Sequence, residues 1–272
     1  MTASPAVGEV PGGPVVAARS PSVDIVREIT RGGLAGLVVG LVLAGIGGRL
    51  AMRAAALLEP DAAGLRTENG NVIGAITPEG TLALVVFAGL LFGIVVGALW
   101  VVMRPWLPRS PGMRALTAVP IALAMGSTGL ISATNPDFMI LGRNLGIVLL
   151  LVVLVALFGP AIVLAETLLD RVLPVPGSRR SVAPAVYAVI TTIGTLFTLL
   201  LVLPLYLTSS IALAGAAFVV VGLATAAHWL LRSRRTPEPV WLPLVARGAL
   251  VLATVAGLAV AVPEILGAAN LA

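Results

Sequence analysis

Residues 145–165 read LGIVLLLVVLVALFGPAIVLA, a run of 21 residues without a charged side chain. About 20 consecutive apolar residues are needed for a helix to cross the hydrocarbon core of a bilayer, so this run predicts a transmembrane helix. Six similar runs are bounded by charged residues, Pro or Gly, and they cover residues 33–56, 81–103, 113–133, 182–203, 210–231 and 244–262. We therefore expect an all-α protein, a polytopic transmembrane helix bundle of about seven spans.

The composition of the 272-residue chain agrees with this class. Hydrophobic residues make up 58% and charged residues 11% of the sequence, whereas a soluble domain has about 45–50% and about 25%. Residues 1–28 are rich in Pro, Gly, Ala and Ser and contain no apolar run. We expect them to form a flexible cytoplasmic tail, and residues 29–272 to form the transmembrane helical domain.

The arginines predict the orientation, because short cytoplasmic loops carry an excess of basic residues. Four alternate polar segments hold three arginines each: Arg19, Arg27 and Arg31; Arg104, Arg109 and Arg114; Arg171, Arg179 and Arg180; and Arg232, Arg234 and Arg235. The intervening loops hold only Arg66 and Arg143 and otherwise lean acidic. This alternation predicts that the N-terminus lies inside and the C-terminus outside. We expect the protein to be a multi-pass protein of a bacterial plasma membrane.

The first outer loop contains a turn signal. Asn69-Gly70 lies between short arms within Leu65 to Ile73, and Asn-Gly suits a type I′ turn because both positions tolerate positive φ. We expect a small outer hairpin here, and an irregular polar loop is the alternative.

A resemblance covers roughly the first hundred residues. The segment GGRLAMR at 47–53 followed by GLRTENGNVIGAITPEGT at 64–81 resembles a pattern found in uncharacterised multi-pass membrane proteins of actinobacterial type. The resemblance implies a polytopic bacterial membrane protein, and it assigns no activity and no catalytic residue.

Small residues recur at every fourth position in three of the expected helices. They are Gly32, Gly36, Gly40, Ala44 and Gly48; Gly89, Gly93 and Gly97; and Ala249, Ala253, Gly257 and Ala261. Such stripes mark close helix crossings in membranes, where small side chains let backbones approach. We expect the first two helices to cross at Gly40 and Gly93, and dimerisation through one stripe is the alternative.

Arg49 and Arg53 oppose the orientation rule, because they lie one turn apart near the outer end of the first expected helix. With the outer carboxylates Glu79 and Asp137 they form a candidate charge cluster, either a structural one or an anion-binding vestibule. The alternative is that both arginines snorkel to the headgroups.

Hydroxyl groups supply the other candidate site. Thr191, Thr195 and Thr198 share one face of the fifth expected helix, and such a face points into the bundle for helix packing or for lining a ligand path.

Several function classes are excluded by the residue types. The chain has no Cys, one His and no Lys, which excludes thiolate metal sites, multi-histidine sites and a retinal Schiff base. The arginines lie between apolar segments and do not form a solvated basic face, which argues against nucleic-acid binding. We also expect Ser127 and His228 to lie at different depths, too far apart for a hydrolase pair.

The function expected by elimination is a non-enzymatic packing or accessory membrane subunit without a cofactor or a catalytic residue. Its partners would be the lipid bilayer and either a second copy or another membrane protein. The alternative is a small-solute or lipid transporter with a hydroxyl-lined interior.

The topology makes the first testable prediction. Reporter fusions after Arg109, Arg180 and Arg235 should report the cytoplasm, because these arginines belong to the basic segments. Fusions near Gly70 and at the C-terminus should report the outside. A cytoplasmic C-terminus would contradict the seven-span arrangement.

Overall fold

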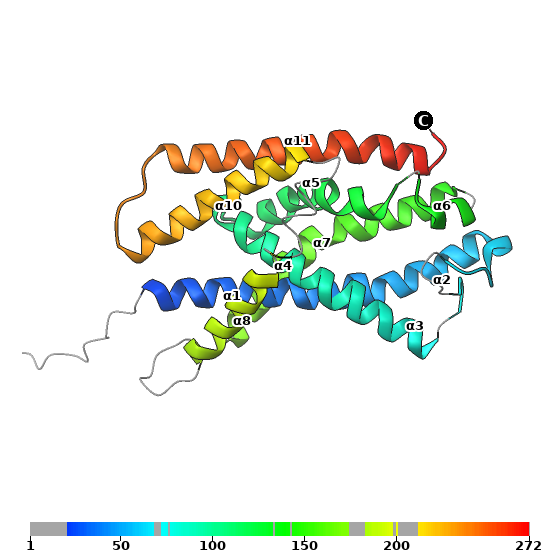
Figure 1. Ribbon diagram of the computed structural model, residues 1–272, viewed down its shortest axis with the longest axis horizontal. Helices are drawn as coiled ribbons and strands as arrows, with labels where there is room; N and C mark the ends of the chain where they lie inside the picture. The colour runs from blue at the N-terminus through cyan, green and yellow to red at the C-terminus, as the bar shows by residue number, and fades with distance from the viewer. Residues whose placement is uncertain are drawn as a thin grey trace, which may run out of the picture.

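The computed structural model describes residues 21–67, 72–75, 77–132, 134–141, 143–173, 183–197, 200 and 212–271, and their regular elements are helical (Figure 1). Two long rods come first, each with a π-helical middle. They are α1 Pro21–Val39, η1 Gly40–Gly47 and α2 Gly48–Leu58, followed by η2 Pro60–Ala62; and α3 Pro78–Ala83, η3 Leu84–Leu91 and α4 Phe92–Met103, followed by η4 Arg104–Trp106. The remaining helices are α5 Pro111–Leu130, α6 Pro136–Ile140, α7 Leu145–Val172, α8 Ala183–Phe197, α10 Ala212–Ser233 and α11 Trp241–Ala268.

In the part of the chain that the structure describes, five helical segments are long and apolar enough to cross a membrane, so the chain is built as a multi-pass membrane protein. They are Pro21–Leu58, Pro78–Trp106, Leu145–Val172, Ala212–Ser233 and Trp241–Ala268. The other two expected runs contain α5, with 20 residues, and α8, described over 15 residues. Neither is among the five, so a total of seven spans stays a prediction.

The first rod begins earlier than the sequence predicts. α1 starts at Pro21, so residues 21–28 of the expected tail are helical. The reason is tertiary, because Arg27 and Glu28 form ion pairs with other helices. The helical domain therefore includes these residues.

The helices run between two ends of the molecule, which we name here. At the arginine-rich end, ion pairs join the start of α1 to η4 and to the ends of α7 and α10. At the opposite end, Ile131, Val148 and Ala268 join the end of α5, the start of α7 and the end of α11 in one apolar cluster. Helices α1, α5 and α11 therefore run from the arginine-rich end to the opposite end, whereas α7 and α10 run back toward the arginine-rich end.

The two rods cross through backbone contact, as the small-residue stripes predict. A Cβ atom added to Gly36 would overlap the backbone of Gly97, and one added to Gly40 would overlap the backbone of Gly93. The crossing continues into the π-helical segments, where a Cβ on Gly89 would lie 3.2 Å from the Cα of Leu41. The prediction of a crossing at Gly40 and Gly93 is confirmed.

The stripe in α11 also packs within the chain. A Cβ on Gly257 would lie 2.8 Å from the carbonyl oxygen of Ala124 in α5, and Ala253 and Ala261 are buried beside it. This stripe therefore holds α11 against α5.

The arms of the expected hairpin pair at the opposite end. The Ile73 amide donates to the Leu65 carbonyl at 2.9 Å, and the Gly64 amide donates to the Ile73 carbonyl at 3.0 Å. Arg66 and Val72 form one antiparallel bridge. The turn at Asn69-Gly70 lies outside the described residues.

The glycine crossing makes the second testable prediction. Gly36→Ala should lower the thermal stability of the purified protein by the equivalent of about 1–3 kcal/mol, because the added methyl group forces the rods apart. Gly33→Ala is the matched control in the same helix, since a Cβ there meets no atom within 4 Å. Equal stability of the two variants would contradict the close crossing.

Candidate functional site

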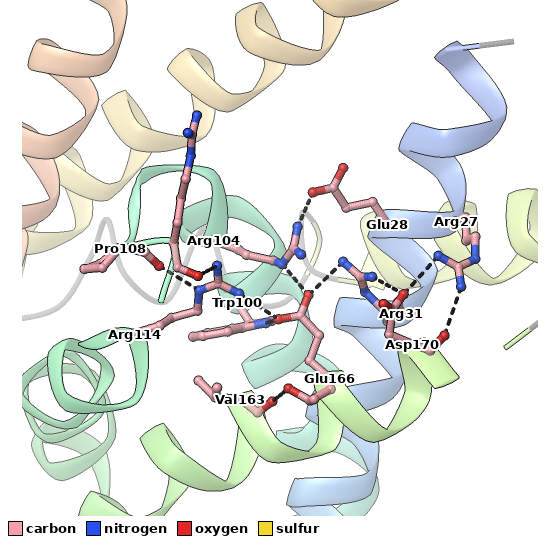
Figure 2. A network of polar contacts seen from close by, with 12 residues as sticks. Arg27, Glu28, Arg31, Trp100, Arg104, Pro108, Arg114, Val163, Glu166 and Asp170 are labelled. Carbon is pink, nitrogen blue, oxygen red and sulfur yellow. Dashed lines mark hydrogen bonds and ion pairs between the residues drawn. The ribbon is translucent and has the colours of Figure 1, made fainter. Parts of the chain in front are cut away.

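A buried carboxylate in α7 organises the arginine-rich end (Figure 2). Glu166 is only 4% exposed. Its Oε1 lies 3.2 Å from Nη2 of Arg31 and forms an ion pair with Nε of Arg104, and its Oε2 lies 3.7 Å from Nη1 of Arg114. The indole Nε1 of Trp100 donates to Oε2 at 3.3 Å. Side chains from α1, α4, η4 and α5 thus converge on one carboxylate of α7.

Further ion pairs extend this cluster across the arginine-rich end. Asp170 pairs with Arg31 and, at 3.0 Å, with Nη1 of Arg27. Glu28 pairs with Arg104 and, at 2.8 Å, with Nη1 of Arg232 in α10. We call this set of five arginines and three carboxylates the inner charge network.

The helix repeat explains why the arginines of α1 can pair with the carboxylates of α7. Arg27 and Arg31 are four residues apart in α1, and Glu166 and Asp170 are four residues apart in α7. Residues at this spacing share one face of a helix, so two arginines of one helix can face two carboxylates of the other. Arg27 and Arg31 are predicted from the sequence to lie in a basic segment, but their pairing with α7 is not predicted, although the matched spacing of four residues is visible in the sequence.

An apolar cavity of about 850 Å³ lies between the two rods and helices α5 and α7. On α7 its lining extends from Ile147 to Ile162, which is about 22 Å at 1.5 Å per residue. The lining residues Phe87 and Leu130 are 68% and 44% exposed. The cavity therefore opens sideways, toward the apolar surface that faces lipid.

The two ends of the cavity differ in chemistry. Towards the arginine-rich end its lining includes Met103, Ala118 and Ile162. These residues lie about one helical turn or less from Arg104, Arg114 and Glu166, respectively. The inner charge network therefore closes this end. Towards the opposite end its polar lining residues are Thr67, Asn135 and Asp137.

The two predicted outer arginines bind α3 and the loop before it. Arg49 is 7% exposed, and its Nε donates to Thr81 Oγ1 at 3.2 Å while its Nη2 donates to the Thr77 carbonyl at 3.3 Å. Arg53 donates to the Gly74 carbonyl. Both arginines therefore donate to hydroxyl or carbonyl oxygens.

The predicted acidic members of this cluster lie in neighbouring elements. Glu79 is exposed in the first turn of α3, and Asp137 is in the first turn of α6. Within the described ranges no ion pair joins Glu79 to Arg49 or Arg53. Whether the four residues act as one charge cluster or vestibule stays a prediction.

The predicted hydroxyl face cannot be placed. The side chains of Thr191 and Thr195, and all of Thr198, lie outside the described residues, so their role stays a prediction. His228, which the sequence offers as a candidate partner of Ser127, pairs with Glu238, with 2.7 Å between Nδ1 and Oε1. Its ring packs edge-on against Trp106.

No protein-family model, curated protein or solved structure matches this chain. The inner charge network and the apolar cavity are the two features of the molecule that indicate a function.

The buried carboxylate makes the third testable prediction. Glu166→Gln should destabilise the protein by about 3–5 kcal/mol, because the largely shielded guanidinium groups of Arg31, Arg104 and Arg114 lose a compensating charge that they share. Glu79→Gln is the control at an exposed carboxylate and should cost no more than about 1 kcal/mol. Unfolding in detergent measures both, and equal losses would contradict the central role of Glu166.

Proposed function

We propose that this chain binds the hydrocarbon part of a lipid within the membrane, as a lipid-binding or lipid-transporting protein. The observation that carries the proposal is the apolar cavity of about 850 Å³ with a side opening. Its volume lies within the range of about 300–1,000 Å³ that is usual for ligand pockets.

The cavity's chemistry favours a lipid over a polar solute. Water is disfavoured in an apolar cavity because it finds too few hydrogen-bond partners, and an empty cavity deprives its lining atoms of dispersion contacts. A cavity that opens toward hydrocarbon is best filled by a hydrocarbon chain. Of the two transporter types expected from the sequence, small-solute and lipid, the cavity therefore favours a lipid transporter.

We also propose the seven-span topology with the arginine-rich end in the cytoplasm. α7 ends at the arginine-rich end, and so does α10, whose 22 residues extend about 33 Å back toward the opposite end. α8, described over Ala183–Phe197, lies between α7 and α10 along the chain and supports one further crossing between the two ends. The basic residues support a cytoplasmic position for this end in a bacterial plasma membrane.

The packing or accessory role expected from the sequence stays a prediction. It is the function that remains if the apolar cavity holds no lipid. Membership of the actinobacterial type of membrane protein that the first hundred residues resemble is likewise a proposal.

The fourth testable prediction fills the cavity with protein. Ala122→Phe and Ala88→Phe each place a phenyl ring where the lining is small, so each should reduce the lipid that remains bound after purification in mild detergent. Native mass spectrometry counts the bound lipid. The matched control is Ala216→Phe on the exposed face of α10, away from the cavity. Equal lipid content in all three variants would overturn the proposal.

A further inference from the structure

A second, smaller pocket lies between α1 and α10 at the arginine-rich end. Its volume is about 370 Å³, and its lining consists of Asp24, Arg27, Glu28, Arg31 and Arg232. Every lining residue is charged, in contrast to the apolar cavity. The pocket therefore suits a small ionic group.

The sign of the charge follows from the inner charge network. Its five arginines exceed its three carboxylates by two positive charges. Asp24, which lines the pocket, leaves one positive charge in excess. Four of the arginine side chains are at most 19% exposed. Buried charges are costly when they are not compensated, so this end favours an additional anion.

Donors are available on the same arginines. Nε of Arg27 and Nε of Arg31 are buried and have no hydrogen-bond partner among the described residues, and Arg31 as a whole is 9% exposed. Arg232 is more open, with 42% of its side chain exposed, and it pairs with Glu28. Guanidinium groups suit phosphate because their planar N–H donors match its oxygens.

We propose that this pocket binds a phosphate group, as carried by the headgroup of an anionic phospholipid. The pocket lies where α1 and α10 reach the charged edge of their spans, which is the depth of lipid headgroups. Basic pockets between transmembrane helices bind anionic headgroups on the cytoplasmic side. Free phosphate has the same chemistry, and the experiment separates the two sources. The inference does not depend on the apolar cavity.

Two substitutions at the pocket should act in opposite directions. Arg232→Gln removes the most accessible cation and should weaken binding about fivefold, the equivalent of about 1 kcal/mol for one basic residue near a lipid surface. Asp24→Asn removes a repulsive carboxylate and should strengthen binding by a similar factor. A variant that merely folds poorly cannot show stronger binding. Arg234→Gln, at the end of the same strongly basic segment but outside the pocket, should change nothing.

The fifth testable prediction is measured by titrating the full-length protein in detergent. Short-chain phosphatidylglycerol, phosphatidylcholine with the same chains, and inorganic phosphate are compared by thermal shift and native mass spectrometry. Preference for phosphatidylglycerol, with the ordered response of the variants, supports a lipid headgroup. Equally strong binding of inorganic phosphate, with the same response, supports the phosphate site and assigns its ligand to solution. Equal weakening by Arg232→Gln and Arg234→Gln, or weaker binding by Asp24→Asn, overturns the proposal.

Discussion

The contact between Glu166 and its three arginines is the interaction on which the rest of the arrangement depends. It joins α1, η4 and α5 to α7 at the arginine-rich end (Figure 2). The two rods are already fixed to each other by their glycine crossing. The carboxylate therefore determines how far the rod pair lies from α5 and α7 at this end, and that distance defines the closed end of the apolar cavity.

This arrangement decides how a ligand reaches the cavity. Burial of Glu166 and Trp100 excludes an approach from the arginine-rich end, whereas exposed Phe87 lies at the side opening. A lipid bound according to our proposal enters from the bilayer. Its chain then points toward the inner charge network, and its polar part lies near Asn135 and Asp137 at the opposite end.

The sequence predicts those features that depend on local composition. Apolar runs predict the helices, and small residues at every fourth position predict the crossing at Gly40 and Gly93, because both patterns lie within single helices. The Glu166 contacts join residues up to 135 positions apart, as with Arg31, and charge counting alone does not pair them. The sequence does not predict the cavity, because residues that line a cavity, pack in a core or face lipid are equally apolar.

The two ends of the bundle are held by interactions of different strength. At the arginine-rich end, breaking a buried ion pair leaves an uncompensated charge, at about 3–5 kcal/mol. At the opposite end, Arg49 and Arg53 are held by hydrogen bonds to Thr81 and to carbonyl groups, and a hydrogen bond to a charged group contributes about 1.5–3 kcal/mol. These bonds join the two rods to each other, because Arg49 and Arg53 lie in α2 and their acceptors lie in α3 and just before it. The inner charge network, by contrast, joins both rods to α5 and α7, so it holds the rod pair against the rest of the bundle at the arginine-rich end.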